Sequence, residues 1–176
     1  NWVTFMNAGD SYVSPEALNT VFSRSLDHVS FIYTDMFLLN ASGKRVRKIS
    51  AERLTYNSIT KGMIACHQGM IVRRDSCPTY DVTFRYQGDL NWTMQILKQL
   101  KPEQVLYIPI TLVYFKSGGF SDHTIGQQLR EHLYLIVSRY GYFMLLLRLP
   151  RLFRRYIGKW LRIFLGIETF RFWIKS

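Results

Sequence analysis

The chain has 176 residues, of which 48% are hydrophobic and 15% aromatic, and it carries a formal net charge of +11. This length and composition allow a packed core and exclude an intrinsically disordered chain. The two cysteines are too few for a disulfide framework and lack the paired spacing of a structural zinc site, so they indicate a reducing compartment.

The positive charge is concentrated toward the C-terminus. Residues 1–138 hold 14 Lys or Arg and 11 Asp or Glu, a net of +3, whereas residues 139–176 hold 9 Lys or Arg against one Glu, a net of +8. The charge therefore belongs to a tail and not to the domain before it. Because that tail also contains long apolar strings, we expect no nucleic-acid partner.

The first half of the chain predicts alternating strands and helices. Asn1 to Met6 is an apolar run that predicts a buried strand, and we expect upstream sequence to supply its neighbours. Ser14-Pro15-Glu16 is typical of a helix start. Val29 to Leu39 is a β-rich apolar run, and a turn at residues 40–44 would return the chain along Arg45 to Ile49 as a hairpin.

The second half continues this alternation. The predicted elements are, in order, a short helix with a loop (54–64), a strand (69–73), a loop or short strand (80–86), a helix (89–100), a strand (105–115) and a helix (about 124–139). Pro109 interrupts the last strand and predicts an edge position or a bend. The pattern indicates an α/β fold with a mainly parallel or mixed sheet and flanking helices.

Two acidic residues stand at or near the ends of predicted strands. Asp10 follows the first strand in a turn that contains Gly9, beside Asn7, where a carboxylate suits a hard divalent cation but also suits a turn former. Asp35 lies late in its strand. It needs a partner or a cleft if it is buried, and a strand end in solvent is an equal alternative.

Further polar residues follow apolar segments. His67 and Gln68 precede Gly69, which permits close backbone approach, although a lone histidine is more often structural. Asp89 stands at a helix start, where it could cap the helix or accept a proton from a hydroxyl group. Gly118 and Gly119 form a loop that could be a rim over a substrate.

The order of these segments resembles the family-2 glycosyltransferases of the GT-A type, in particular bacterial enzymes of exopolysaccharide and colanic-acid-type synthesis. The segments are MNAGD, IYTD, CHQG, GDLNW and KSGGFS, and the resemblance covers residues 1–122. It implies a partial GT-A fold, a Rossmann-like mixed sheet flanked by helices, with the nucleotide-binding part lying upstream of Asn1. Residues 1–138 would be the C-terminal part of this catalytic domain.

The resemblance also implies roles for the residues. Asp10 would be the metal ligand, for Mn²⁺ or Mg²⁺, with Asn7 in place of the usual first acid of the motif. Asp89 would be the general base of an inverting transfer. His67 and Gln68 would line the donor diphosphate or the acceptor site, and Asp35 would be a secondary cleft residue. The implied partners are a nucleotide-sugar donor and a glycan or lipid-linked sugar acceptor.

Residues 139–176 alternate apolar and basic residues, with aromatic residues throughout. The longest uninterrupted apolar run, Tyr142 to Leu147, is far shorter than the roughly 20 residues that span a bilayer. The pattern predicts basic amphipathic helices lying on a membrane surface, on the cytoplasmic face of the inner membrane for such an enzyme. A helix that packs its apolar side on the domain is the alternative.

Two functions remain open at this stage. The first is a sugar-nucleotide-dependent transferase of surface polysaccharide synthesis. The second is a non-catalytic, membrane-associated module, either a degenerate relative or a truncated product. A nucleic-acid-binding domain is a weaker third, and it predicts binding that weakens steeply with salt.

Overall fold

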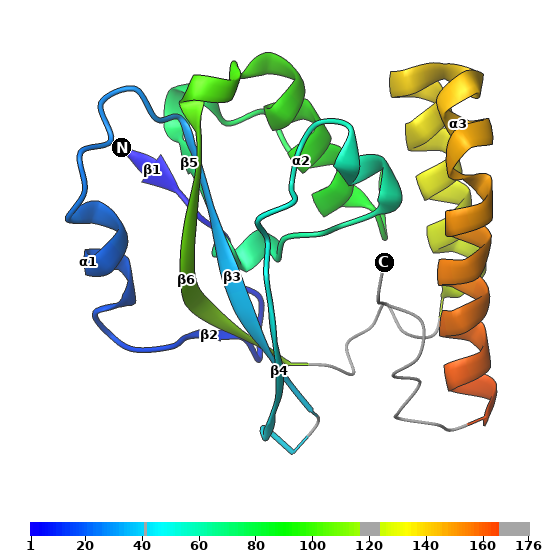
Figure 1. Cartoon of the computed structure of the whole chain (residues 1–176), viewed down its shortest axis with the longest axis horizontal. Coiled ribbons are helices and arrows are strands. Elements are labelled where there is room, and N and C mark those ends of the chain that lie inside the picture. Colours follow the sequence, from blue (N-terminus) through cyan, green and yellow to red (C-terminus); the bar gives the residue numbers. More distant parts are fainter. Residues whose placement is uncertain (41, 117–123, 166–176) are drawn as a thin grey trace. The chain divides into compact units, whose positions relative to one another are not determined.

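A computed structural model describes residues 1–40, 42–116 and 124–165, with the side chains of residues 159 and 162–165 left aside. Its described residues form a six-stranded mixed sheet in the order β1-β5-β3-β6-β2, with β4 paired to β3 beside this path (Figure 1). The strands are β1 (Trp2–Val3), β2 (Ser11–Tyr12), β3 (Phe31–Leu39), β4 (Arg45–Ile49), β5 (Met70–Arg73) and β6 (Val105–Lys116).

Three α-helices and four short 3-10 helices complete the described elements. The α-helices are α1 (Ala17–Phe22), α2 (Gly88–Gln99) and α3 (Ile125–Leu165). The 3-10 helices are η1 (Ser58–Lys61), η2 (His67–Gly69), η3 (Arg74–Ser76) and η4 (Pro102–Gln104). The chain divides into two compact units: the described part of residues 1–83 and 88–118 forms the first, and that of residues 84–87 and 119–176 the second.

The long strands β3 and β6 form the centre of the first unit and are its only parallel pair among the described strands; all other pairs are antiparallel. The β3–β6 register runs regularly from Phe31 to Thr34 and then shifts, so that Thr34 pairs with Ile108 but Asp35 pairs with Thr111. Pro109 lies in this shift. Proline has no backbone N–H to donate to the ladder, and Pro109 lies where the ladder is interrupted.

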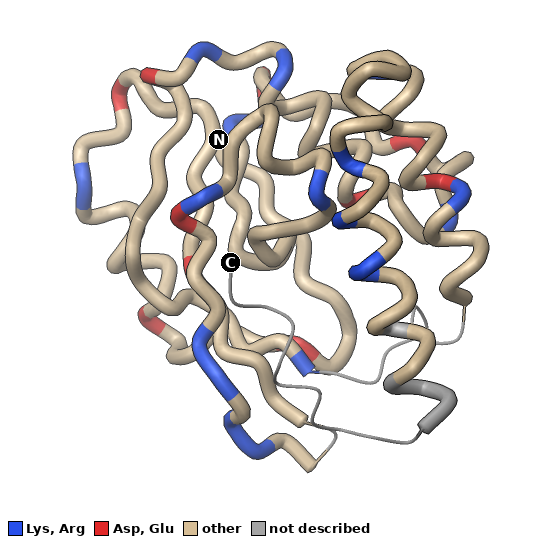
Figure 2. The backbone as a smooth tube through the Cα atoms, turned by 45° about the vertical axis from the view of Figure 1, so that its right-hand side comes forward, with Lys and Arg blue, Asp and Glu red and all other residues tan. Residues whose placement is uncertain are grey.

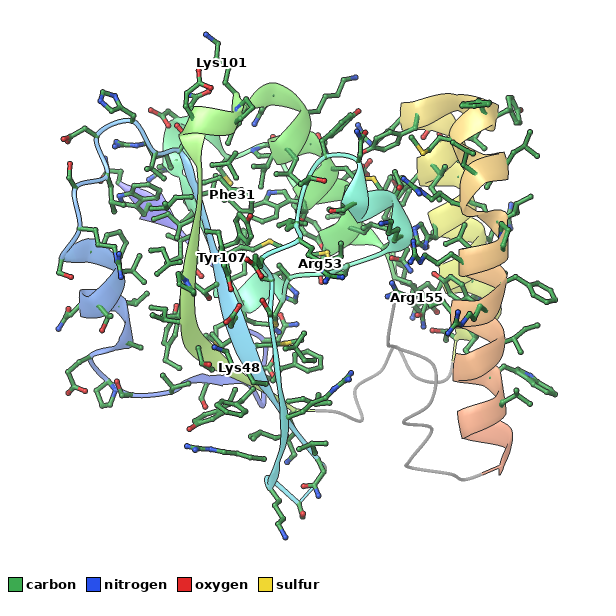
Figure 3. All side chains as sticks on the ribbon, in the orientation of Figure 1. Phe31, Lys48, Arg53, Lys101, Tyr107 and Arg155 are labelled. Carbon is green, nitrogen blue, oxygen red and sulfur yellow. The ribbon has the colours of Figure 1, made fainter. Side chains whose placement is uncertain are left out.

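The two faces of this sheet are covered by different helices. Alternate residues of a strand point to opposite faces, so Ile71 lies opposite to Met70 and Val72. Ile71 joins Val21 of α1 in one buried cluster. On the other face, Thr93 of α2 donates a hydrogen bond to the sulfur of Met70 at 3.5 Å. Phe31, on this second side, stacks on Tyr33, and Tyr33 stacks on Tyr107 (Figure 3).

The second unit is an antiparallel helical hairpin. Gly141 interrupts α3 with φ 80° and ψ 172°, a backbone conformation that residues with a side chain rarely adopt, and the chain reverses there (Figure 1). Ile136 before the break and Leu152 and Tyr156 after it are buried against each other. His132 Nδ1 and Tyr156 Oη lie 3.1 Å apart and add a polar contact between the two halves.

Most predicted elements are confirmed, including β4, β5 and α2, and one expectation needs correction. The first strand is not a buried strand of six residues: β1 has two residues at the sheet edge, and Phe5 and Met6 are exposed. The predicted edge position or bend at Pro109 agrees with the structure: the register with β3 shifts there, and β2 pairs with β6 only further along, at Val113 and Tyr114. The sheet is mixed, which is one of the two predicted alternatives, with one parallel pair among its described strands.

Candidate functional site

Asp10 is held at the C-terminal end of β6. It lies in the turn between β1 and β2, where its backbone N–H donates to the carbonyl of Asn7 at 3.1 Å and Gly9 has φ 93°. One carboxylate oxygen accepts the backbone N–H of Lys116, the last residue of β6, at 2.9 Å. The carboxyl ends of parallel strands are where open α/β sheets bind ligands. Asp10 was predicted at such an end, but it reaches the end of a different strand.

The 3-10 helix η2 links Asp10 to the second half of the site. The side-chain amide of Gln68, which is fully buried, donates to the other carboxylate oxygen of Asp10 and accepts from the thiol of Cys66. The carbonyl of Gly69 accepts from the hydroxyl of Thr34 at 3.1 Å. A Cβ at Gly69 would lie 2.8 Å from that hydroxyl oxygen, so glycine is what allows η2 to approach β3 this closely.

Asp89 occupies the first turn of α2 and faces η2. Its Oδ2 lies 3.0 Å from Nδ1 of His67, and its Oδ1 accepts the phenol of Tyr80 at 2.7 Å. The side chain of Asp89 is 41% exposed and that of His67 is 11% exposed. A Cβ at Gly88 would collide with the Tyr80 phenol, so Gly88 leaves the space in which Tyr80 reaches Asp89. Asp89 is therefore oriented on both oxygens yet remains open to solvent.

The adjacent residues His67 and Gln68 thus link two carboxylates that are far apart in the sequence, those of Asp89 and Asp10. Burial lowers the pKa of His67 below its ordinary value, while the charges of Asp89 and Asp10 act in the opposite direction. A neutral imidazole whose Nδ1 faces a carboxylate must carry its proton on that nitrogen. The neighbouring Cys66 is buried, and this burial raises the pKa of its thiol to about 12, so it stays protonated.

Asp35 lies apart from this cluster, which we call the Asp10–Asp89 cluster (Asp10, His67, Gln68, Tyr80 and Asp89). Its side chain is 2% exposed and is 2.8 Å from Nζ of Lys48 on β4 (Figure 3). It also accepts the backbone N–H of Ala51 at 2.9 Å and the phenol of Tyr107 at 2.7 Å. These partners satisfy the buried charge without a ligand, and the predicted role in substrate binding is not needed to explain it.

The predicted metal site centres on one carboxylate. Within the described ranges, no three His, Cys, Asp or Glu side chains are grouped so as to hold a metal. Asp10 offers two oxygens that each accept one hydrogen bond, and the exposed Asn7 stands at the other end of its turn. Mg²⁺ commonly takes one or two protein carboxylates and completes its shell with substrate phosphates and water. The donor set of this turn fits that mode and does not fit an all-protein metal cage.

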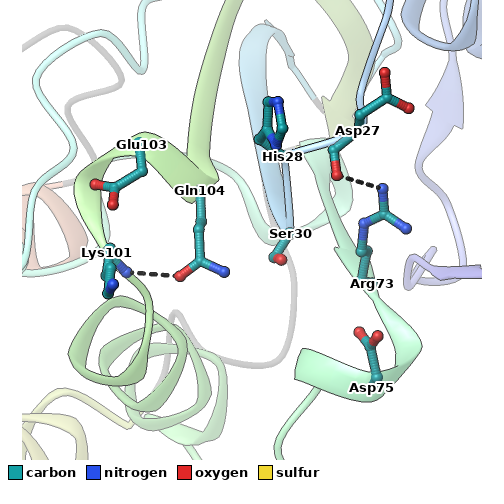
Figure 4. A pocket seen from close by; sticks show the side chains of 8 residues that line it. All are labelled: Asp27, His28, Ser30, Arg73, Asp75, Lys101, Glu103 and Gln104. Atoms are coloured by element: carbon teal, nitrogen blue, oxygen red, sulfur yellow. Dashed lines mark hydrogen bonds between the residues drawn. The ribbon is translucent and has the colours of Figure 1, made fainter.

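Two further regions bear on the site. Gly118 and Gly119, predicted as a substrate rim, lie outside the described residues. An open hollow of about 740 Å³ lies by the starts of β3 and β6, at the opposite end of these strands from Asp10 (Figure 4). It is lined by residues of both charges, and its Arg73 already donates to the carbonyls of Leu26 and Val29. The hollow therefore shows no preference for one ligand charge.

Sequence reasoning did not single out Tyr80, Lys48 or Tyr107. Tyr80 is nine residues from Asp89 and follows no helical spacing, since it lies in a loop. Tyr107 and Asp35 are 72 residues apart. The one available signal was Gly88: a glycine directly before the candidate base indicates that something packs close to the helix start.

Comparisons with known proteins do not identify a family. No protein-family model matches the chain. No curated protein matches it either. What the Asp10–Asp89 cluster does must therefore be inferred from its own geometry.

Proposed function

We propose that this chain carries the acceptor and metal side of an inverting glycosyltransferase, which moves a sugar from a nucleotide-sugar donor to a glycan or lipid-linked acceptor in surface polysaccharide synthesis at the cytoplasmic face of the inner membrane. The observation that supports the proposal best is that two carboxylates contact adjacent residues of η2: Asp89 contacts His67, and Asp10 contacts Gln68. We take the described mixed sheet to be part of a GT-A domain.

Asp89 is the general base in this proposal. It is partly exposed, so an acceptor hydroxyl can reach it, and His67 and Tyr80 each donate to one of its oxygens. Each oxygen keeps a lone pair for the incoming proton. The hydroxyl proton passes to Asp89 while the acceptor oxygen forms a bond to the anomeric carbon, and the bond from that carbon to the diphosphate breaks from the opposite side.

Asp10 serves the leaving group. When bound, Mg²⁺ or Mn²⁺ would neutralise the negative charge that develops on the departing nucleoside diphosphate. Asp10 is suited to hold such a cation because Lys116 N–H and Gln68 fix both of its oxygens at the end of β6. Asn7 and His67 lie in the two turns that meet here, so we assign them to the donor diphosphate and the acceptor, whereas the fully buried Gln68 positions Asp10 and does not touch either substrate.

The alternative is a non-catalytic, membrane-associated module. One observation favours it: Asp10 is a single carboxylate, already hydrogen-bonded on both oxygens, where a full motif would have two acids. Under this alternative the cluster only fixes η2 against α2 and β6. Substitution of Asp10 or Asp89 would then change stability and nothing else.

The test is release of nucleoside diphosphate from a panel of sugar nucleotides, with Mg²⁺ or Mn²⁺ and with membrane extract as the source of acceptor. The protein is used with its natural N-terminus. We expect one donor to be turned over, and we expect Asp89→Asn and Asp10→Asn each to lower kcat by at least about a hundredfold. Asp75→Asn, an exposed acid of the same unit, is the control and should leave turnover unchanged.

Two results would contradict the proposal. No turnover of any donor would favour the non-catalytic module. Equal turnover by wild type and Asp89→Asn would remove Asp89 as the base even if the chain is a transferase. Thermal unfolding of each variant distinguishes loss of chemistry from loss of fold, because a folded but inactive Asp89→Asn variant supports the assigned role.

A further inference from the structure

Among the side chains that the structure describes, one side of the second half of α3 is buried within its unit. Leu152 and Tyr156 are buried against the first half of the helix, and Met144 and Leu145 pack beside them. On a helix, residues three, four and seven positions apart share a side. The packed side therefore accounts for these four residues and leaves the rest of the helix surface to other contacts.

A second apolar stripe runs along the side that does not pack. Six of its members, at positions 142, 146, 149, 153, 157 and 160, recur every three or four residues over more than four helical turns, and positions 143 and 147 lie beside them. Each member is between 39% and 75% exposed. They are Tyr142, Phe143, Leu146, Leu147, Leu149, Phe153, Ile157 and Trp160. Single exposed apolar residues are ordinary, but a continuous stripe of this kind marks a surface that binds something.

Charge indicates what that surface binds. Residues 142–165 contain six Lys or Arg and no Asp or Glu. Figure 2 shows Lys and Arg in blue along the described part of this helix. Two copies of this helix would meet with like charges, which disfavours self-association through the stripe. A bilayer that contains anionic lipid offers both an apolar interior for the stripe and negative headgroups for the basic residues.

We propose that the second half of α3 lies in the interface of an anionic lipid bilayer, with the side chains of the stripe inserted among the acyl chains. The basic residues then stay at headgroup level, where their charges are attracted to the anionic lipid. No helix among the described residues meets the length and hydropathy needed to cross a membrane. The proposal concerns a surface outside the Asp10–Asp89 cluster, and it stands or falls independently of the transfer reaction.

The test is co-sedimentation of the full chain with vesicles of phosphatidylcholine alone or with 30% phosphatidylglycerol. We expect strong binding only to the anionic vesicles, weakened by added salt. The triple variant Leu146→Ser, Phe153→Ser, Ile157→Ser should lower the partition coefficient by at least about tenfold. The double variant Met6→Ser, Val82→Ser removes exposed apolar residues from the first unit and should bind as wild type does.

A second measurement needs no disruptive substitution. Brominated lipid should quench the emission of Trp160, and the part of the quenching that is lost in Trp160→Phe reports that position alone. Equal binding to neutral vesicles, an unchanged triple variant, or no quenching at Trp160 would each overturn the proposal. A concentration-dependent dimer that the triple variant abolishes, without vesicle binding, would show that a second copy covers the stripe instead.

Discussion

Burial gives Asp35 and Asp89 different chemistry, although both belong to the first unit. Asp35 is 2% exposed, and Lys48, Ala51 and Tyr107 donate to its two oxygens, whereas Asp89 is 41% exposed. Burial alone would raise the pKa of Asp35. Its hydrogen bonds to Lys48, Ala51 and Tyr107, with the charge of Lys48, outweigh that effect and lower the pKa.

Asp35→Ala is predicted to destabilise the fold by about 2–4 kcal/mol, because it leaves buried donors and the Lys48 ammonium without their partner. Since the folded-state pKa of Asp35 is lowered, its contribution is present above the unfolded value of about 3.9 and is lost as pH falls through the folded value. Urea unfolding between pH 3 and pH 7 measures both effects. Glu16→Ala, at an exposed position, is the control. A loss below about 0.5 kcal/mol would contradict this role for Asp35.

His67 reports on the assembly of the cluster. Its pKa is lowered in the folded protein, so the unfolded chain takes up the proton first as pH falls through about 6.5, and the free energy of unfolding decreases in that range. Because the charges of Asp89 and Asp10 oppose the lowering, Asp89→Asn and Asp10→Asn should each lower the pKa of His67 further. NMR titration of the imidazole measures this, with Asp75→Asn as control. An unchanged pKa in Asp10→Asn would show that Asp10 does not act on His67.

At the scale of elements, substitutions of two glycines of α3 should change the free energy of unfolding in opposite directions. Gly141 has φ 80°, whereas Gly158 has no positive φ and a Cβ there would meet nothing within 4 Å. Gly141→Ala should lower the free energy of unfolding by about 1 kcal/mol or more, because the substituted residue is strained. Gly158→Ala should raise it by about 0.5–1 kcal/mol through helix propensity. Thermal unfolding of both variants measures these changes. If the free energy of unfolding changed in the same direction in both variants, the chain would not reverse at Gly141.

The elements that sequence reasoning located are those with a strong local signal. β3 is rich in apolar and β-favouring residues, and the turn through Gly43, with φ 79°, returns the chain along β4. The reversal at Gly141 was missed because a single glycine inside an amphipathic pattern does not by itself indicate a turn. Pro109 predicted an edge position or a bend in β6, but its register shift against β3 depends on the partner strand, which no local pattern reveals.

The same limit applies to the site. Asp10, His67, Gln68 and Asp89 were singled out because each is a polar residue next to an apolar segment. Their convergence depends on η2 lying against Thr34 of β3, a contact between residues 35 positions apart. Their roles in catalysis stay predictions. Tyr80 and Lys48 act through pairings that only the folded chain brings about.

At the scale of the whole molecule, charge and structure divide the chain at different places. Residues 1–138 have a net charge of +3 and residues 139–176 a net of +8, and the break at Gly141 falls close to this boundary. The second compact unit includes all of α3, so this charge boundary lies within that unit. Residues 84–87, between the loop of Tyr80 and the start of α2, belong to the second unit together with α3.

Glu131 of α3 is what holds this segment. Its two carboxylate oxygens accept the backbone N–H groups of Arg85, Tyr86 and Gln87 at 3.1, 2.9 and 2.8 Å. Gln87 also donates through its side chain to the carbonyl of Gln128 at 3.3 Å. An ionised acceptor shared by three amides makes stronger bonds than a neutral one. The segment before Asp89 is thus fixed by a residue more than 40 positions further along the chain.

Glu131→Gln should therefore raise hydrogen exchange at the amides of residues 85–87 by at least about tenfold, because the side-chain amide offers one acceptor oxygen where the carboxylate offers two. Exchange in β3 and β6 of the first unit should not change. Mass spectrometry of peptides from residues 84–88 measures the effect, and Glu103→Gln, at an exposed position, is the matched control. If β3 exchanged faster as well, loss of the Glu131 contact would have destabilised both units, and they would unfold as one cooperative body.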